Sequence, residues 1–377
     1  MAGIFRAASV IMGAIVGAGI FAIPYVIIKS GLTIGLIHII IISIIMTLLF
    51  LYLGEICLRT KGDHQLPGYA EKYLGKKGKI LMFISLLYGI NTAILAYLIG
   101  IGNSLSFIIF NNSDYILPLG IAFWIIMSVL SYLGLKTLKE TELIGVSTVI
   151  IFIISLAIFS ANKINIDNFI HTQSLDLLDY FAPFGAILFA FLGYSIVPEI
   201  KEILKNDKSK IKHSIILAIF SCAVIYIIFT IIVIGLKGEN TPKIATIALG
   251  KPFILLGIIT MFNAYFTLSI TLIDIFQLDF KLTKFKSWFL TTIIPLILFT
   301  ILSITNNADF TKILSIGGII SGTLSSLLIL SMINKAKIYG NRHPEYSLPA
   351  SKILTFLLII IFIIGSVTGL INSFLPP

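Results

Sequence analysis

Two apolar stretches of the chain carry glycine and proline where a continuous helix would be weakened. The first breaks most readily at Val16-Gly17-Ala18-Gly19, and the second at Phe191-Leu192-Gly193-Tyr194-Ser195, just before Pro198. In a helix interior, glycine costs about 1 kcal/mol and proline about 3 kcal/mol relative to alanine. Each break would free main-chain N–H groups at the start of one half-helix and carbonyl groups at the end of the other. We therefore predict that both stretches are discontinuous helices.

Freed main-chain groups inside a membrane are tolerated only where they line a cavity or meet a ligand. The N–H end of a half-helix suits a carboxylate, and the carbonyl end suits an ammonium group or a metal ion. The two breaks together are typical of a receptor for a zwitterion, whose expected substrate-binding residues are Gly17, Ala18, Gly19, Phe191, Gly193, Tyr194 and Ser195. The alternative is close helix packing through small residues, which is our interpretation of a later stripe, Ser315, Gly318, Gly322 and Ser326.

Polar side chains on two other stretches could complete this receptor. Asn263, Thr267, Thr271 and Asp274 follow one another at intervals of 4, 4 and 3, which places them on one helix face. Such a face predicts a cavity or a partner helix, although hydroxyl groups can also bond to carbonyls of their own helix.

Tyr88 and Asn91 share a face of the stretch at 80–110 with Thr92. We expect Tyr88 to close over a bound solute or to donate a hydrogen bond to its carboxylate. The alternative is a buried tyrosine with a single structural partner.

Four carboxylates lie near one end of their apolar stretches: Glu55, Glu199, Glu202 and Asp274. Glu55, Glu199 and Asp274 are all close to basic loops, so we expect gating salt bridges from them. The alternative is ordinary solvation at a helix end.

The amino-acid composition shows in which environment the helices that carry these residues must lie. Of 377 residues, 58% are hydrophobic and 12% are charged, whereas soluble domains average about 25% charged residues. So little charge excludes a soluble globular protein, a disordered chain and, despite a net charge of +10, a nucleic-acid binder. The chain is expected to lie in a lipid bilayer.

Eleven apolar runs are long enough to cross about 30 Å of hydrocarbon as helices. They do not alternate as the strands of a membrane barrel would. The runs lie at about 8–28, 32–57, 80–110, 116–134, 142–160, 181–200, 214–236, 252–277, 288–305, 311–333 and 352–373.

The basic residues orient these spans. With the N-terminus inside, 21 of the 27 Lys and Arg residues fall in inner segments, which fits the positive-inside rule. Eleven spans then put the C-terminus outside. No loop is long enough for a soluble domain, so we predict one multi-pass domain, residues 1–377, in the cell membrane.

Enzymatic and ATP-driven functions are not expected. The sequence has no G-x-S-x-G, H-E-x-x-H or G-x-x-x-x-G-K-[ST] motif. Its two cysteines, Cys57 and Cys222, lie in or beside apolar runs and cannot form a disulfide framework or a metal motif. Movement of a solute would therefore draw on an ion gradient, on exchange or on the gradient of the solute itself.

Three segments of the chain resemble a known superfamily. GAIVGAGIFAIPYVIIKSG (Gly13 to Gly31) resembles the first span of the amino acid–polyamine–organocation superfamily, and ILFAFLGYSIVPEI (Ile187 to Ile200) resembles its sixth. AYLIGIGNSL (Ala96 to Leu105) is similar to the third span of the amino acid/auxin permease branch. Eleven spans with this orientation fit that branch and the related aromatic amino acid permeases.

The resemblance implies an all-α, LeuT-like fold and alternating access. Two inverted five-helix repeats would occupy about 8–160 and 181–333, followed by one extra helix at about 352–373. Main-chain groups of Gly17, Ala18 and Gly19 would meet the carboxylate of an amino acid. Carbonyls near Phe191, Leu192 and Tyr194 would take its ammonium group.

The resemblance leaves the coupling ion open between H⁺ and Na⁺. A family sodium pocket would use the carbonyls of Gly13 and Val16 with the hydroxyls of Thr267 and Thr271. Sodium-coupled relatives often have adjacent hydroxyls there, whereas the hydroxyls of Thr267, Ser269 and Thr271 are spaced by two. Some proton-dependent or uncoupled relatives place a lysine in the fifth span, and residues 142–160 contain none. No other cofactor is expected.

The function predicted from these residues is secondary transport of neutral amino acids, aromatic or branched ones among them. No charged side chain lies centrally in a span to select a cationic or acidic substrate. The alternative is a membrane sensor that binds an amino acid without moving it. A third class, an intramembrane enzyme, would need converging carboxylates or histidines that the sequence does not assemble.

Overall fold

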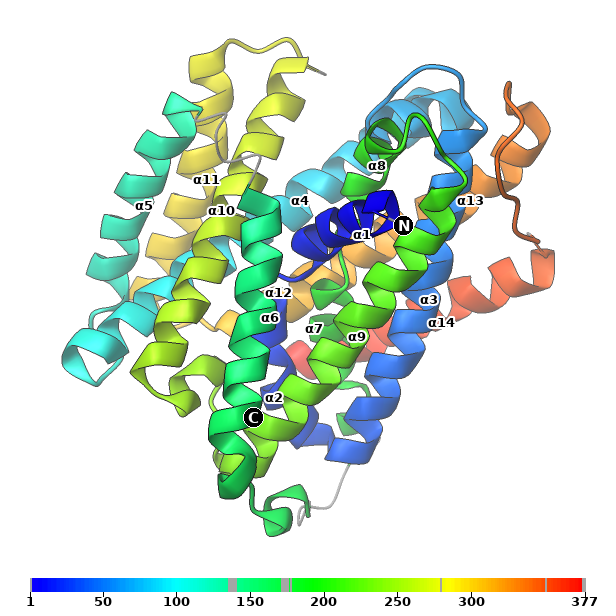
Figure 1. Cartoon of the computed structure of the whole chain (residues 1–377). Coiled ribbons are helices and arrows are strands. Elements are labelled where there is room, and N and C mark those ends of the chain that lie inside the picture. The colour runs from blue at the N-terminus through cyan, green and yellow to red at the C-terminus, as the bar shows by residue number, and fades with distance from the viewer. Residues whose placement is uncertain are drawn as a thin grey trace.

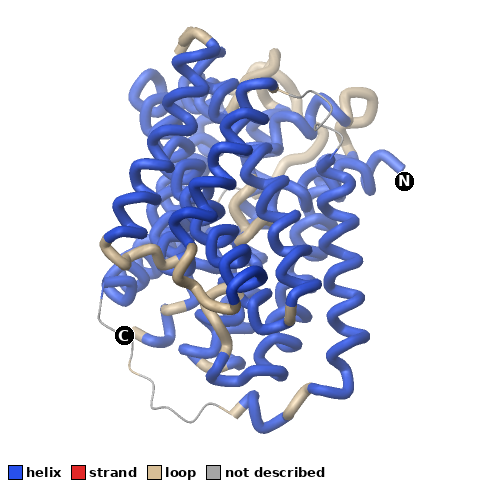
Figure 2. Tube along the Cα trace, turned by 90° about the vertical axis from the view of Figure 1, so that its left-hand side faces the viewer, coloured by secondary structure: helices blue, strands red, loops and turns tan. Residues whose placement is uncertain are grey.

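The computed structural model describes residues 2–134, 141–170, 176, 178–278, 280–349 and 351–374, with the side chains of 2, 141–148 and 161 left aside. Helices make up nearly all of this part of the chain, run along the bundle and are joined mostly at its two ends (Figure 2). The described residues contain no β-strand. The all-α class predicted from the sequence is therefore confirmed.

The helices follow the predicted apolar runs closely. They are α1 (Ala2–Ile15), α2 (Gly19–Ser30), α3 (Leu32–Leu58), α4 (Leu66–Phe110), α5 (Ile116–Leu133), α6 (Thr141–Ser160), α7 (Pro183–Ala190), α8 (Val197–Ile203), α9 (Lys210–Lys237), α10 (Lys251–Leu278), α11 (Lys284–Ile304), α12 (Phe310–Gly317), α13 (Thr323–Tyr339) and α14 (Lys352–Phe374). A π-helical turn, Gly318–Gly322, joins α12 to α13. The third run begins earlier than predicted because α4 has a first segment before Gly75, whose φ of 76° kinks the helix.

Nine helices or helix runs in the described part of the chain are long and apolar enough to cross a membrane. Taken as one span, the pair α1 and α2, bent by 62°, is the tenth. Helix α6 has 20 residues, of which the described side chains, Val149–Ser160, make a shorter apolar segment. The count of eleven and the direction of the spans stay predictions, and the basic residues Lys136 and Lys139 used for the latter lie outside the described residues.

Apolar side chains lie both inside and outside the bundle. One buried cluster extends from Ala7 to Phe362. Isoleucine and phenylalanine also cover the outer surface, with Ile44, Ile151 and Phe220 more than 60% exposed. Water would oppose so much exposed apolar surface, whereas lipid matches it. The surface therefore agrees with a multi-pass membrane protein.

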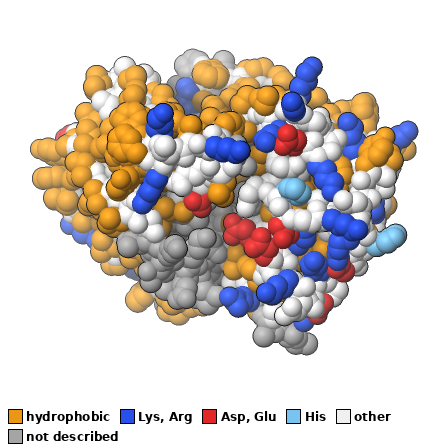
Figure 3. All heavy atoms as spheres, turned by 90° about the horizontal axis from the view of Figure 1, so that it is seen from above, with side chains coloured by type: hydrophobic (Ala, Val, Ile, Leu, Met, Phe, Trp, Pro, Cys, Tyr) orange, Lys and Arg blue, Asp and Glu red, His pale blue; other side chains and the backbone are white. Residues whose placement is uncertain are grey.

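The loops at one end of the bundle carry most of the charge. At this end, the top of Figure 1, the chain begins, and the connections α3–α4, α8–α9, α10–α11 and α13–α14 lie there. We call it the N-terminal face. Seen from above, Lys and Arg side chains are spread over it, while Asp and Glu gather near its centre (Figure 3). The sequence predicts that this face is cytoplasmic.

Candidate functional site

The first span is broken where the glycines predict it. Helix α1 ends at Ile15, residues Val16–Ala18 are not helical, and α2 begins at Gly19. The N–H of Gly17 turns back to the carbonyl of Ile15 at 3.0 Å, a contact that no α-helix makes. The main chain is thus exposed between the two halves, as the sequence analysis anticipates.

The sixth span breaks at the predicted place as well. Helix α7 ends at Ala190, and α8 begins at Val197 with Pro198 in its first turn. Leu192 and Gly193 lie between these helices, followed by one 3₁₀ turn, Tyr194–Ile196. Proline suits the first turn of a helix because its missing N–H would have no partner there. Pro198 therefore restarts the helix.

Glycine lets the two breaks touch. A Cβ atom on Gly19 would lie 2.7 Å from the Cα of Ala190, and one on Gly193 would lie 2.9 Å from a side-chain carbon of Ile15. No side chain fits at such separations without displacing its neighbour. The start of α2 therefore packs on the end of α7, and the end of α1 packs on the unwound segment of the sixth span.

A cavity of about 530 Å³ lies against both breaks. Parts of α1, α4, α8 and α10 also form its walls. Of the predicted substrate-binding residues, it is lined by Gly17, Gly19, Gly193, Tyr194 and Ser195. Of the predicted sodium ligands, Gly13, Val16, Thr267 and Thr271 all line it. Whether they hold a ligand or an ion stays a prediction.

The polar face of α10 lies along this cavity. Asn263, Thr267, Thr271 and Asp274 all contribute to the wall. The hydroxyl of Thr271 donates to the carbonyl of Thr267 at 2.9 Å, so the self-bonding expected as the alternative also occurs. The two interpretations of this face are therefore compatible.

Four predicted site residues are not among those that line the cavity. Ala18 and Phe191 are fully buried, and neither side chain lines the cavity. Tyr88 is 37% exposed and also lies outside the wall. Asn91 donates its Nδ2 hydrogen to the carbonyl of Leu87 at 2.8 Å, within its own helix. The structure therefore gives Tyr88 and Asn91 no contact with the cavity.

A different face of α4 forms the wall. It presents Leu86, Gly89, Ile90, Ala93 and Tyr97 to the cavity. The hydroxyl of Tyr97 interacts with the main chain of Ala18, and a Cβ on Gly17 would lie 2.8 Å from its oxygen. Tyr97 is not among the site residues predicted from the sequence, because a single tyrosine in an apolar span indicates only that its hydroxyl needs a partner.

The cavity reaches the N-terminal face, and among the described residues none from the connections at the opposite end lines it. Its mouth includes Gln65, Glu199, Glu202, Asp274 and Leu278, at the ends of α4, α8 and α10 that meet that face. The mouth therefore carries two of the three predicted gating carboxylates, Glu199 and Asp274, and Figure 3 shows acidic side chains at the centre of this face.

Four phenylalanines pack beyond the breaks, on the side away from the mouth. We call Phe21, Phe152, Phe229 and Phe253 the aromatic seal. The ring centroids of Phe21 and Phe229 are 6.0 Å apart, and those of Phe152 and Phe253 are 5.6 Å apart. The rings come from α2, α6, α9 and α10, so four helices close this side. No local sequence signal links rings so far apart in the chain.

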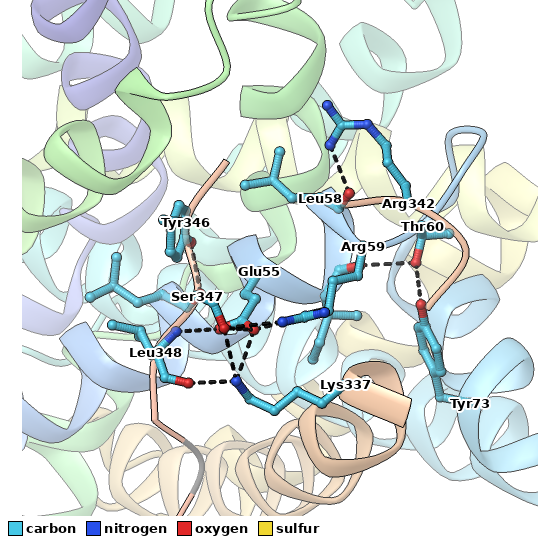
Figure 4. Close-up of polar contacts among 12 residues, drawn as sticks. Glu55, Leu58, Arg59, Thr60, Tyr73, Lys337, Arg342, Tyr346, Ser347 and Leu348 are labelled. Atoms are coloured by element: carbon cyan, nitrogen blue, oxygen red, sulfur yellow. Dashed lines mark hydrogen bonds and ion pairs between the residues drawn. The ribbon is translucent and has the colours of Figure 1, made fainter. Parts of the chain in front are cut away.

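The third gating candidate, Glu55, does not lie at the mouth. Its buried carboxylate accepts from Arg59 Nε at 2.8 Å, Ser347 Oγ at 2.9 Å and the N–H of Leu348 at 2.8 Å, and it pairs with Lys337 Nζ at 3.0 Å (Figure 4). We call these five residues the Glu55 clasp. The clasp attaches the α13–α14 connection to the end of α3. Glu55 therefore forms salt bridges, as predicted, but it does not line the cavity.

The fold and the site together define a class of protein. A helical membrane bundle in which two broken spans line a cavity open at one end is a secondary transporter. The sequence model of the tryptophan/tyrosine permease family matches residues 1–248, so the chain belongs to that family and is an amino acid permease.

A solved structure shows the same fold. The chain is similar to the crystal structure of MhsT in complex with L-phenylalanine, with a TM-score of 0.68 and 15% sequence identity. The match covers 99% of this chain and 98% of that one. The LeuT-like fold expected from the sequence is therefore confirmed. No curated protein sequence matches the chain.

Proposed function

We propose that the protein carries a neutral aromatic amino acid across the cell membrane by alternating access, unchanged chemically. The observation that carries the proposal is the cavity between the two breaks, open at the N-terminal face and closed by the aromatic seal. A carrier needs a central site that communicates with one side at a time. The structure would then be the inward-open state of an amino acid–polyamine–organocation carrier.

The cavity wall favours a neutral substrate with a large side chain. Its volume of about 530 Å³ lies within the usual range for small-molecule sites. Among the described residues no Lys or Arg lines it, and its carboxylates lie at the mouth. The walls between are largely apolar, with Leu86, Ile90, Phe189 and Ile225 among them. An aromatic ring would bury its surface there, consistent with the family to which the chain belongs.

The substrate backbone would bind at the breaks. The main chain of Gly17, Ala18 and Gly19 stands at the start of α2, where N–H groups and the positive end of the helix dipole favour a carboxylate. The main chain of the sixth-span break, from Phe191 to Ser195, would meet the ammonium group. Tyr88 and Asn91 have no part in this arrangement.

The proposed coupling ion is H⁺ or Na⁺, with no other cofactor. A sodium ion would use the carbonyls of Gly13 and Val16 with the hydroxyls of Thr267 and Thr271, all of which line the cavity. The two structural repeats would span about 8–160 and 181–333, with α14 as the additional helix.

Purified protein in liposomes tests the proposal. Labelled tryptophan, tyrosine and phenylalanine should enter the vesicles above the protein-free background. An excess of unlabelled aromatic amino acid should compete, while glutamate and lysine should not. Imposing Na⁺ and pH gradients separately identifies the coupling ion. Absence of both flux and binding for all aromatic amino acids would refute the proposal. Saturable binding without flux would favour the alternative, an amino acid sensor.

A further inference from the structure

One buried hydroxyl lies between the two broken helices. Tyr226 of α9 is fully buried, and its hydroxyl donates to the carbonyl of Ala190 at 2.7 Å. The same oxygen lies 3.4 Å from the carbonyl of Ile15. Ile15 is the last residue of α1, and Ala190 is the last residue of α7. A single side chain from a third helix therefore contacts the C-terminal end of both half-helices.

These two carbonyls have a specific electrostatic character. The last carbonyls of a helix have no partner within it, and the helix dipole makes that end negative. Two such ends that converge inside a membrane form a site with the polarity that a cation prefers, and broken helices of membrane carriers use it in that way. Here the Tyr226 hydroxyl points toward these carbonyl ends. Its hydrogen supplies a partial positive charge without a net charge.

The position of the hydroxyl is well defined. The ring of Tyr226 packs edge-on against Phe191 with centroids 5.0 Å apart. Phe191, the residue after α7, is itself fully buried. This packing explains why Phe191 does not reach the cavity, because its ring orients Tyr226 instead of meeting substrate.

We propose that Tyr226 is a positioning residue that takes the place of a cation between the ends of α1 and α7. Its hydroxyl fixes the two half-helices against each other and so holds the adjoining breaks in a substrate-ready arrangement. This inference rests on the proposed carrier function for its effect on substrate binding, but not for its effect on the binding of ions. A coupling cation, where one is used, must then bind at another place, such as the group formed by Gly13, Val16, Thr267 and Thr271.

The test compares Tyr226→Phe with Tyr265→Phe. Tyr265, on α10, is also fully buried, but its hydroxyl has no hydrogen-bond partner among the described residues and it does not line the cavity. Each variant loses one buried phenol oxygen, so the pair separates the bridging role from the general effect of removing a hydroxyl.

The first measurement needs no substrate. The melting temperature of detergent-purified protein is recorded during titration with Na⁺ or Li⁺, with choline keeping the ionic strength constant. A cation that binds the folded state raises the melting temperature with its concentration. Tyr226→Phe should gain a cation-dependent rise beyond any rise shown by the wild type, and Tyr265→Phe should not. The same response in all three proteins would overturn the proposal.

The second measurement is the affinity for tryptophan. In choline, Tyr226→Phe should bind roughly 3- to 10-fold more weakly than the wild type, the loss expected for one hydrogen bond. Na⁺ or Li⁺ should recover part of this loss. Equal weakening in every salt would mean that Tyr226 is only structural and would also overturn the proposal.

The design keeps the two hypotheses apart. If the wild type binds no aromatic amino acid, the proposed substrate fails while the melting titration still tests Tyr226. If Tyr226→Phe yields no folded protein, Tyr226→Met enters the same comparison, because its flexible side chain can fill the space of the ring without a donor.

Discussion

Glycine lies at the breaks of the first and sixth spans of this permease, whereas the span formed by α12 and α13 holds Gly317, Gly318 and Gly322 without a break. In the first and sixth spans the helix stops and restarts, and Gly17, Gly19 and Gly193 line the cavity. In the span formed by α12 and α13 the helix continues through a π-helical turn that contains Gly318 and Gly322. No glycine of that span lines the cavity.

The difference lies in what the glycines face. A Cβ on Gly318 would lie 2.2 Å from the carbonyl oxygen of Gly185, so this glycine allows α7 to approach the π-helical turn. The glycines of the broken spans also face open space that a solute can enter. Glycine content therefore indicates close approach of backbones, and a break needs in addition a cavity or a partner that receives the freed main-chain groups.

Substitution of Gly318 should have the largest effect. In Gly318→Val the new side chain would meet the backbone at Gly185 and, at 2.8 Å, the nitrogen of Phe189. Neither atom can move aside alone, so we expect loss of folded protein, measured by size-exclusion chromatography in detergent. Gly322→Ala should be milder, because its nearest neighbour is the side chain of Leu188 at 3.0 Å. Normal yield and melting temperature of Gly318→Val would show that this span is not closely packed.

Substitution of Gly17 should weaken substrate binding and leave folding intact. In Gly17→Ala the Cβ would lie 2.8 Å from the Tyr97 hydroxyl, the end of a side chain that can move. We expect at least about tenfold weaker tryptophan binding, equivalent to about 1.4 kcal/mol, with little change in melting temperature. Tyr97→Phe in the same chain should recover part of the affinity. Unchanged affinity in Gly17→Ala would refute the role of this break in binding.

Gly317 offers a smaller test of the packed span. A Cβ there would lie 2.4 Å from the Cγ2 methyl of Thr92 on α4. Gly317→Ala should therefore lower stability by about 1–3 kcal/mol, as overpacking does. Thr92→Ser removes that methyl group and keeps a hydroxyl, so the double variant should regain most of the melting temperature. Absence of any recovery would mean that the strain lies elsewhere.

The smallest effect should come from the attachment of α8, the second half of the broken sixth span. Lys201 Nζ contacts Asp63 Oδ1 at 2.9 Å and the carbonyl of Gly62 at 2.6 Å. The hydrogen bond and charge of Lys201 lower the pKa of the Asp63 carboxyl. The ion pair between Asp63 and Lys201 therefore stabilises the folded protein above the ordinary aspartate pKa of about 3.9. This stabilisation is lost as the pH falls through the lowered pKa of Asp63.

Because the Asp63 side chain is 64% exposed, we expect Asp63→Asn to cost less than about 1 kcal/mol at pH 7. The difference in melting temperature between the variant and the wild type should shrink toward pH 3. A difference that stays constant with pH would show that the ion pair does not hold α8.

Features set by neighbouring residues could be predicted from the sequence. Both breaks lie where glycine and proline weaken the helix, and the α10 face follows from the helical period. The face of α4 that carries Tyr88 and Asn91 does not line the cavity. The Asn91 Nδ2 group and the Thr92 hydroxyl instead donate to carbonyls of their own helix at 2.8 and 2.7 Å. A polar side chain in an apolar span does not by itself indicate a cavity.

Features that join distant parts of the chain could not be predicted. Leu348 and Glu55 are 293 residues apart, and Tyr226 meets Ile15 across 211 residues. A tyrosine in an apolar span indicates only that its hydroxyl needs a partner. The four rings of the aromatic seal likewise meet only because four helices converge.

The Glu55 clasp has a mechanical consequence for the last helix. Helix α14 packs against α7, α12 and α13, all from the second half of the chain, yet the connection leading into it is tied to α3, in the first half. A rocking motion between the two halves would therefore act on α14 through both its packing on the second half and its attachment to α3. Leu348 lies close in sequence to Lys352, the start of α14, so this short connection would limit how far the two halves can move relative to each other.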